Sequence, residues 1–383
     1  MLDFGVTAAT FRQRYLEREV YLHRSAMLER PFDWGAIDTL LHQIEPTPAL
    51  MQLFHGGLVP QENYVEDVVD LGMPRRRVSK SRFYGYLQNG ATLVANRLEL
   101  NSPVVKRACL EVGRFVAQQT LCNAYLSCGG EGTFGKHWDT HDVFVVQAIG
   151  SKRWQVYRPT FPLPLSQHAS SAAPSQPDEP PVLDVVLQSG DLLYIPRGWW
   201  HQVTPLNEAS FHLSIGAYLP TVHDFMMWAC SRVVPQNESA RKGIGGSAYV
   251  PNDTASALQT LGEALRSPAL LQQFLAELGG REQLSAEFNL GLMLDPKSSG
   301  LSSAAAVRLT TYQRPVFDNG EITINGARLR LDRVSQAIVQ SLAETEDMTV
   351  QQVCAQIKDT PADAVRARLV ELAKHDIVSL GVD

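Results

Sequence analysis

Between residues 120 and 220 the chain consists of short apolar segments separated by turn residues. Gly, Ser, Pro and Asp stand between them, as in Ile-Gly-Ser-Lys at 149–152. Six segments have the length and alternation of β-strands: 120–127, 142–149, 153–157, 183–188, 191–196 and 209–219. So many short strands in sequence predict a sandwich or barrel of the jelly-roll type. The Ser/Pro/Ala-rich stretch 166–181 is expected to be an exposed, mobile loop.

The rest of the chain has other patterns. Short helical patterns and loops fill the first ninety residues, and apolar residues at helical spacing follow Pro220. After about residue 296 a hairpin with Asn-Gly turns precedes further helices, in the proportions of a winged helix. The sequence therefore predicts a β-rich domain with N-terminal helices over 1–220, an all-α region over 221–295 and a small α+β, winged-helix-like domain over 296–383.

Composition excludes several classes of protein. A hydrophobic fraction of 44% and a net charge of −6 are typical of a soluble globular chain and give no reason to expect nucleic acid or an anionic membrane as partner. No apolar run approaches the length of a bilayer span. The five cysteines form no Cys-x-x-Cys pair, which argues against disulfides or a thiolate zinc site and favours a reducing cytoplasm.

Charge and apolar surface also suggest partners. Residues 294–383 contain ten Lys/Arg and twelve Asp/Glu, a net charge of −2, whereas a DNA-reading winged helix normally presents a basic face. We therefore expect a protein-contact module and no DNA binding. The segment Asp-Phe-Met-Met-Trp-Ala-Cys at 224–230 carries more large apolar surface than a solvated helix keeps, which predicts a homodimer unless it packs on the chain's own barrel.

The candidate metal ligands are His137, Asp139 and His201. On a strand, two residues two positions apart point to one face, so His137 and Asp139 would point into the barrel together. The third ligand should come from a distant strand, and His201 follows the segment Gly-Asp-Leu-Leu-Tyr-Ile-Pro-Arg-Gly-Trp-Trp at 190–200. Two histidines and one carboxylate occupy three coordination positions of an octahedral metal ion and leave three open for substrate and oxygen. This arrangement favours Fe(II) oxygenase chemistry over a structural zinc.

Other histidines compete for this role. A His-x-Asp triplet alone is often a chance structural feature, so the prediction rests on its combination with the distant His201. His141 is the rival ligand; three ligands two apart on one strand would splay along it, so His141 is interpreted as a residue of the rim. His168 falls in the predicted loop and is expected to be solvated. His212, on a strand, is interpreted as a core histidine.

These motifs resemble the JmjC oxygenases that depend on Fe(II) and 2-oxoglutarate, and among them the ribosomal oxygenases. The resemblance covers about residues 90–220 through Asn-Ala-Tyr-Leu-Ser (123–127), the segment 137–154 and the segment 190–203. It extends more loosely to the order of barrel, helical region and winged helix. It implies a double-stranded β-helix of the cupin/JmjC type, with Fe(II), 2-oxoglutarate and O₂ as the reacting partners.

The resemblance also implies residues that bind the cosubstrate. The family's basic residue 15 positions after the first histidine ligand corresponds to Lys152, whose ammonium would pair with the distal carboxylate. Arg153 alternates to the other side of the strand and takes the solvated role. Asn123 and Tyr125 match positions flanking 2-oxoglutarate, and Ser214 matches a Ser/Thr position near the same carboxylate.

The implied reaction is hydroxylation of an arginine or histidine side chain of a protein, with a ribosomal protein as the leading substrate. A hydroxylase of a free amino acid or biosynthetic peptide is the alternative among enzymes, although it would have little need for a winged helix. The third hypothesis is a non-enzymatic metal-binding cupin or regulator. It does not explain Lys152, which would have no dicarboxylate to bind. The cluster Arg75–Arg77 is interpreted as a solvated loop that could instead contact an RNA-bearing particle.

Overall fold

The structure is a computed structural model with two compact units, Met1–Leu219 and Pro220–Asp383, each of which is described by itself. The residues that it describes are 1–130, 132, 134–172, 177, 179–243, 251–282, 285–294, 300–312, 315, 317–318, 320–345 and 348–381. Across these residues, no helix combines the length and the apolarity that crossing a membrane requires.

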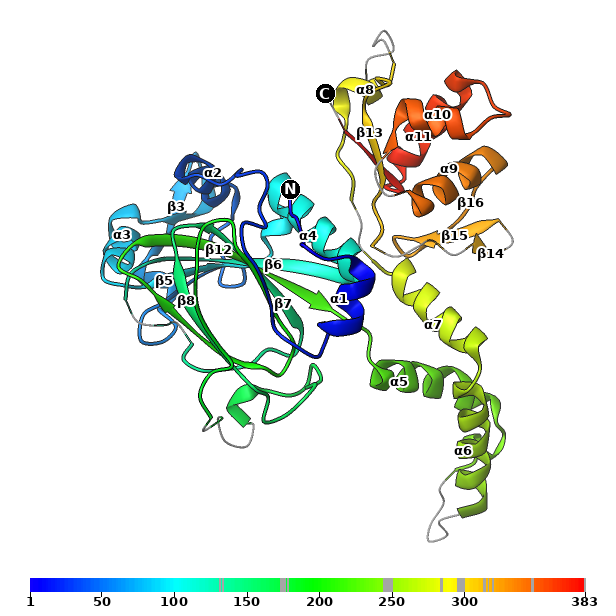
Figure 1. Cartoon of the computed structure of the whole chain (residues 1–383), viewed down its shortest axis with the longest axis horizontal. Helices are drawn as coiled ribbons and strands as arrows, with labels where there is room; N and C mark the ends of the chain where they lie inside the picture. Colours follow the sequence, from blue (N-terminus) through cyan, green and yellow to red (C-terminus); the bar gives the residue numbers. More distant parts are fainter. Residues whose placement is uncertain are drawn as a thin grey trace. The chain divides into compact units, whose positions relative to one another are not determined.

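The first unit is rich in strands (Figure 1). Its helices are α1 (Ala8–Arg14), α2 (Trp34–Gln43), α3 (Lys80–Gln88) and α4 (Pro103–Val116). Its strands are β1 (Tyr21–His23), β2 (Met51–Phe54), β3 (Val65–Asp70), β4 (Met73–Val78), β5 (Thr92–Ala95), β6 (Gln119–Cys128), β7 (Asp142–Ile149), β8 (Lys152–Tyr157), β9 (Leu183–Leu187), β10 (Leu192–Ile195), β11 (Trp200–Pro205) and β12 (Ala209–Tyr218).

Two antiparallel sheets make up the body of this unit. One has the order β1-β10-β7-β12-β6-β5-β2 and the other the order β11-β8-β9. All six strands expected from the sequence between residues 120 and 220 are present, and the prediction of a β-rich first domain is confirmed. A further strand, β11, follows a Pro-Arg-Gly turn and carries His201, the residue that was expected to come from a distant strand.

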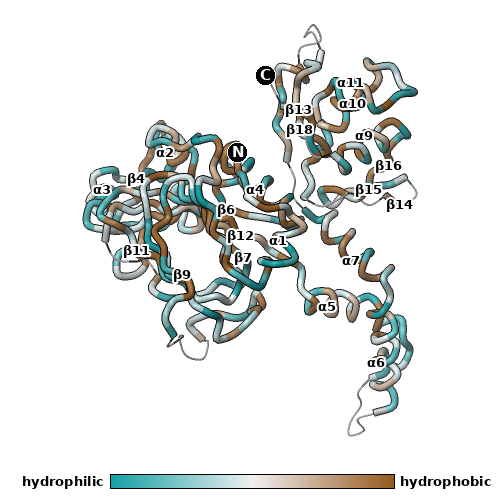
Figure 2. The backbone as a smooth tube through the Cα atoms, in the orientation of Figure 1, coloured by the Kyte–Doolittle hydropathy of each residue, from teal (hydrophilic) through white to brown (hydrophobic). Residues whose placement is uncertain are grey.

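Alternation along the central strands separates two faces of the large sheet. Ala124 and Leu126 on β6, with Leu213 and Ile215 on β12, join a buried apolar core that includes Val112 of α4. Figure 2 shows hydrophobic stretches along the strands of both sheets. The residues in between point to the opposite face, because successive side chains of a strand alternate. Burial of the helix-covered face thus fixes which side chains face the second sheet.

A buried polar network fixes the start of β7. The carboxylate of Asp142 accepts hydrogen bonds from the Tyr194 hydroxyl at 2.7 Å and from the backbone N–H of Arg197 at 2.9 Å. The Tyr194 hydroxyl accepts in turn from the backbone N–H of Glu17 at 2.8 Å. Burial raises the pKa of Asp142 to about 6. The network joins β7 to the segment that links β10 and β11.

The interpretation of Arg75–Arg77 as a loop is wrong. These residues lie in β4, which pairs with β3 in a two-stranded hairpin. Each arginine forms an ion pair with a carboxylate of β3: Arg75 with Asp70 at 3.5 Å, Arg76 with Asp67 at 3.4 Å and Arg77 with Glu66 at 3.1 Å. The basic cluster is therefore neutralised locally, which weakens the hypothesis that it contacts RNA.

The second unit begins with helices and ends with a mixed module. Its helices are α5 (Val222–Val233), α6 (Pro251–Leu265), α7 (Pro268–Gly280), α8 (Leu290–Leu294), α9 (Arg333–Glu344), α10 (Val350–Gln356) and α11 (Ala362–Lys374). Its strands are β13 (Ala306–Leu309), β14 (Phe317–Asp318), β15 (Glu321–Ile324), β16 (Ala327–Arg330), β17 (Met348–Thr349) and β18 (Val378–Leu380). Two three-stranded sheets, β17-β13-β18 and β14-β15-β16, accompany α9–α11.

Part of the apolar segment at 224–230 is used inside this unit. Phe225 and Ala229 of α5 pack against Phe274 of α7, while Met226 and Met227 remain exposed. In the C-terminal module, Asn325 and Gly326 both have positive φ and connect β15 to β16, as the Asn-Gly pair predicted. The other Asn-Gly pair of the expected hairpin begins at Asn319, which lies outside the described residues. The winged-helix assignment stays a prediction.

The network around Asp142 leads to a first prediction. Replacing Tyr194→Phe removes one hydrogen bond to a buried carboxylate and one from a backbone N–H, and should lower the free energy of unfolding by about 1–3 kcal/mol. Thermal denaturation measures the change. The control Tyr84→Phe alters a half-exposed tyrosine and should leave the melting temperature unchanged. Equal melting temperatures for the wild type and Tyr194→Phe would contradict the account.

Candidate active site

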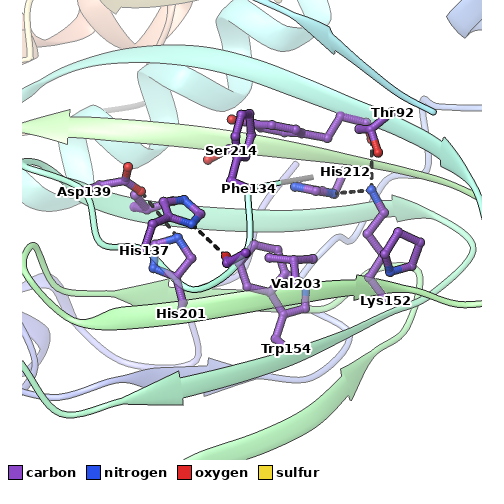
Figure 3. A pocket seen from close by; sticks show the side chains of 14 residues that line it. Thr92, Phe134, His137, Asp139, Lys152, Trp154, His201, Val203, His212 and Ser214 are labelled. Atoms are coloured by element: carbon purple, nitrogen blue, oxygen red, sulfur yellow. Dashed lines mark hydrogen bonds and ion pairs between the residues drawn. The ribbon is translucent and has the colours of Figure 1, made fainter. Parts of the chain in front are cut away.

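A pocket lies between the two sheets of the first unit, on the face of β6 and β12 that points away from the helices. Figure 3 shows His137, Asp139 and His201 gathered at one end of it and Lys152, His212 and Thr92 at the other. Its lining residues are Thr92, Tyr125, Phe134, Gly135, His137, Asp139, Val143, Lys152, Trp154, His201, Val203, Pro205, His212 and Ser214.

His137, Asp139 and His201 form a cluster that fits one metal ion. Each side chain offers a nitrogen or oxygen atom, and these three atoms lie within 4.8 Å of one another. Nε2 of His201 is 3.6 Å from Oδ2 of Asp139, and the two imidazole rings have centroids 4.3 Å apart. Among the described residues, it is the one cluster of at least three His, Cys, Asp or Glu side chains whose ligand atoms lie close enough together to hold a metal ion.

The backbone orients both imidazoles. Nδ1 of His137 lies 3.2 Å from the carbonyl oxygen of Gly135, and Nδ1 of His201 lies 3.2 Å from that of Trp199. A proton on Nδ1 would satisfy these carbonyls and leave the Nε2 lone pairs free. Metal-ligating histidines commonly direct their second nitrogen to such a partner, which fixes the tautomer and the ring orientation.

Electrostatics favour the forms that a metal ion binds. Burial lowers the pKa of His201 to about 4, which keeps its imidazole neutral. Burial acts to raise the pKa of Asp139, but His201, His141 and His137 outweigh it and hold that pKa below its ordinary value. A neutral imidazole and an ionised carboxylate are the forms required of metal ligands. The residues present therefore fit a divalent cation with open coordination positions.

Backbone pairing, and not the alternation of one strand, brings these side chains together. The sequence argument placed His137 and Asp139 on one strand, but β7 begins only at Asp142. His137 instead pairs with His201, with N–H to carbonyl bonds of 3.0 and 2.7 Å in the two directions. The N–H of Gly198 also donates to the carbonyl of Asp139 at 2.9 Å. The residues were predicted, but the geometric reason was wrong.

Lys152 occupies the other end of the pocket. Its side chain is 2% exposed, and its ammonium donates to Nδ1 of His212 at 3.0 Å and to the carbonyl oxygen of Tyr125 at 3.4 Å. No carboxylate of a described residue lies within ion-pair distance of it, and burial lowers its pKa to about 7. A buried ammonium without a counter-ion is unfavourable until an anion is supplied. Arg153, in contrast, is exposed and pairs with Asp184.

The other expected cosubstrate residues lie near this pocket, though not all of them line it. Tyr125 and Ser214 do, and burial raises the pKa of the Tyr125 phenol well above its ordinary value. Asn123 stands beside Ser214 across the β6–β12 ladder but is not among the lining residues. Its Oδ1 accepts a hydrogen bond from the backbone N–H of Arg97 at 3.3 Å.

His141 lies beside the metal cluster and outside it. Its ring stacks on Tyr218, with centroids 4.7 Å apart and planes 18° from parallel. Gly216 makes room for this stack, because a Cβ there would lie 2.6 Å from Cδ2 of His141. His168 belongs to the loop expected at 166–181, of which residues 173–176 and 178 lie outside the described residues. Its Nδ1 accepts from the N–H of Leu165 at 2.8 Å, so it is not simply solvated.

Several lining residues were missed in the sequence. Thr92, Phe134 and Trp154 carry no motif, and they reach the pocket from β5, from the segment before His137 and from β8. His212 was interpreted as a core histidine; it is buried, but it also lines the pocket and contacts Lys152. Its alternation with Ser214 on β12 was the signal that could have revealed it.

Comparison with known proteins agrees with this geometry. A family model described as JmjC domain matches residues 101–225. This part of the chain is therefore similar to a JmjC domain. The match contains β6 to β12 and hence His137, Asp139, His201 and Lys152.

Relatives of the JmjC domain carry informative names. The chain is 36% identical over 146 residues to the bifunctional lysine-specific demethylase and histidyl-hydroxylase NO66 of Drosophila persimilis, which covers 37% of this chain and 21% of that protein. It is 32% identical over 158 residues to ribosomal oxygenase 1 of Gallus gallus, an alignment that covers 41% of this chain and 26% of that protein. The chain thus spans about a quarter or less of the length of these relatives.

A solved structure resembles the chain over almost its whole length. The ribosomal oxygenase YcfD of Escherichia coli aligns with a TM-score of 0.60 at 16% identity and covers 99% of both chains. YcfD has also been solved in complex with cobalt and 2-oxoglutarate, and that structure aligns with a TM-score of 0.57 at 15% identity. At this identity the likeness shows a shared fold.

The ligand cluster leads to a prediction that needs no turnover. Metal-free protein titrated with Co²⁺ should bind one ion per chain, observed by visible absorption, and His137→Ala should lose this binding because one of three ligands is removed. His42→Ala, at an exposed position of α2, is the matched control and should bind as the wild type does. Unchanged Co²⁺ binding by His137→Ala would exclude it as a ligand.

Proposed function

We propose that this chain is an Fe(II)- and 2-oxoglutarate-dependent oxygenase that hydroxylates an arginine or histidine side chain of a protein, with a ribosomal protein as the leading substrate. One observation carries the proposal: in the region that matches the JmjC domain, a His-Asp-His cluster lies at one end of a pocket, and a buried ammonium with no counter-ion among the described residues lies at the other. A 2-oxo dicarboxylate has the matching chemistry, with an oxo acid that chelates metal and a distant carboxylate.

His137, Asp139 and His201 would hold Fe(II), which when bound with 2-oxoglutarate and O₂ supplies the oxidation of a C–H bond with release of succinate and CO₂. Lys152 binds the distal carboxylate through a charge-assisted hydrogen bond. The hydroxyls of Tyr125 and Ser214 offer further hydrogen bonds to the cosubstrate, and Asn123 supports the strand beside Ser214. Trp154 and Val203 present apolar surface that excludes water from the pocket.

The relatives support a protein substrate. Two of them are named for histidyl hydroxylation and for ribosomal oxygenation, and the fold shared with YcfD extends over the whole chain. We place the reaction in the cytoplasm, where ribosomal proteins are available. The C-terminal module, with its winged-helix-like proportions and net negative charge, serves as a contact surface for protein and not for DNA.

Lys152 provides the first test. Lys152→Ala should weaken 2-oxoglutarate binding by about 2–5 kcal/mol, since the carboxylate would lose its buried charge partner. Arg153→Ala removes the neighbouring cation, which is exposed and paired with Asp184, and should leave binding unchanged. Calorimetric titration of metal-loaded protein with 2-oxoglutarate compares the two. Equal effects would remove Lys152 from the proposed role.

Binding should also depend on pH. The pKa of Lys152 in the free protein is about 7, so above pH 7 the side chain must take up a proton before it pairs with the carboxylate. The affinity for 2-oxoglutarate should therefore fall as pH rises from 7 to 9, by up to about tenfold per pH unit, and stay level just below 7. The same titration at several pH values measures it.

The helices of the second unit are proposed to form a homodimer. Val222, Met226 and Met227 of α5 remain exposed in a single chain, in spite of the packing of Phe225 against α7. Light scattering at micromolar concentration should give twice the mass of one chain, and Met227→Glu should shift it towards the monomer. A monomeric wild type would refute this.

The product can be identified in cells. Intact-mass measurement of ribosomal proteins from wild-type and deletion cells should show one protein that lacks a single oxygen atom in the deletion. If all masses agree in the two strains and the purified enzyme instead oxidises a free amino acid or biosynthetic peptide, the alternative substrate class replaces the ribosomal one. If no substrate or 2-oxoglutarate is turned over, the non-enzymatic cupin hypothesis is favoured.

A further inference from the structure

Lys152 and His212 are two basic groups that face each other in a buried position. The ammonium is 3.0 Å from Nδ1 of the imidazole, and both side chains are at most 3% exposed. Lys152 begins β8 in the small sheet, and His212 lies on β12 in the large sheet. The contact therefore spans the two sheets at the end of the pocket away from the metal cluster (Figure 3).

The imidazole of His212 is held in one orientation. Its ring stacks on Tyr125 of β6, with centroids 4.9 Å apart and planes 7° from parallel. Trp154 of β8 meets it edge-on at 5.4 Å and 79°. Aromatic packing on two sides restricts rotation of the ring, so Nδ1 stays directed at the ammonium.

His212 must accept the hydrogen bond that joins the pair. An ammonium has three donors and no acceptor, so Nδ1 has to be unprotonated and the imidazole neutral. Burial and the charge of Lys152 both lower the pKa of His212 well below its ordinary value, which agrees with this state. A second hydrogen bond of the ammonium, to the carbonyl oxygen of Tyr125, is longer at 3.4 Å. His212 is therefore the closer of the two groups that locate the cation.

We infer that His212 is a positioning residue that fixes the Lys152 ammonium at a set distance from the metal cluster, and thereby selects 2-oxoglutarate by its chain length. A lysine side chain has four flexible methylene groups and can follow carboxylates at different depths. Anchored on His212, it meets the distal carboxylate of a five-carbon diacid. The six-carbon analogue, 2-oxoadipate, then extends too far. This inference rests on the proposed function and assigns a role to a residue outside the metal and cosubstrate contacts.

Two substitutions of His212 separate positioning from packing. His212→Leu introduces an apolar side chain of similar size, which offers no hydrogen-bond acceptor to Lys152. His212→Asn places an amide oxygen close to the position of Nδ1, so it can accept the same hydrogen bond. Ser210→Ala is the matched control, since Ser210 is a buried polar residue of the same strand that bonds to Ser127 away from Lys152.

The experiment is calorimetric titration of the Co²⁺-loaded chain, residues 1–383, with 2-oxoglutarate and with 2-oxoadipate, together with melting temperatures. The wild type and Ser210→Ala should prefer 2-oxoglutarate. His212→Leu should raise the dissociation constant for 2-oxoglutarate about tenfold, the effect of one lost hydrogen bond to a charged group, and reduce the preference over 2-oxoadipate. His212→Asn should restore most of the affinity and of the preference.

The outcomes distinguish the inference from the proposed function. If the wild type binds 2-oxoglutarate and His212→Leu binds both diacids with unchanged affinities, the inference is wrong while the oxygenase proposal stands. If His212→Leu and His212→Asn lose affinity equally and with equal losses in melting temperature, His212 only packs, and the inference is again overturned. If the wild type binds neither diacid, the proposed function fails and the inference with it.

Discussion

A buried ammonium with no carboxylate partner among the described residues is the constraint on which the site depends. Lys152 is as buried as the apolar core, and among the described residues its ammonium contacts the imidazole of His212 and the carbonyl oxygen of Tyr125. Such a group is unstable as a purely structural feature and becomes favourable when a carboxylate enters. The His-Asp-His cluster lies at the other end of the pocket. The pocket therefore matches a ligand that chelates a metal ion through one group and carries a negative charge on a distant group.

The fold creates this polar pocket by alternation. The large sheet buries Ala124, Leu126, Leu213 and Ile215 against the helices, and the residues between them must then face the small sheet. Tyr125, His212 and Ser214 are placed by the burial of their neighbours, and a register shift of one residue would exchange the apolar and the polar faces. Packing on one face of the sheet thus determines the chemistry on the other.

The sequence predicted what local pattern and spacing encode. Six strands could be inferred from alternation and turn residues, and the His-Asp-His residues from their motifs, whereas Lys152 was implied by the resemblance to the JmjC oxygenases. The cross-strand pairing of His137 with His201 could not be inferred, since it joins residues 64 positions apart through backbone bonds. The strand at Arg75–Arg77 was hidden because its stabilising carboxylates lie on a partner strand, and a run of charges alone indicates solvent.

Roles that depend on neighbours in space were the hardest to predict. His212 has no motif of its own, and only the ladder with β6 and the approach of β8 set it beside Lys152. Asn123 shows the converse: the resemblance implied a position flanking 2-oxoglutarate, but its amide oxygen accepts a hydrogen bond from the backbone N–H of Arg97. The identity of the residues in a site can be predicted from the sequence more readily than the position and the contacts of each side chain.

The central claim is that one pocket binds metal and 2-oxoglutarate together. Anaerobic titration of the Fe(II)-loaded protein with 2-oxoglutarate, followed by visible absorption, tests this most directly, since chelation of Fe(II) by a 2-oxo acid produces a charge-transfer band. The account predicts a band that saturates at one 2-oxoglutarate per chain and that is missing when glutarate, without the oxo group, is added. A protein that binds Fe(II) but gives no band at saturating 2-oxoglutarate would contradict it.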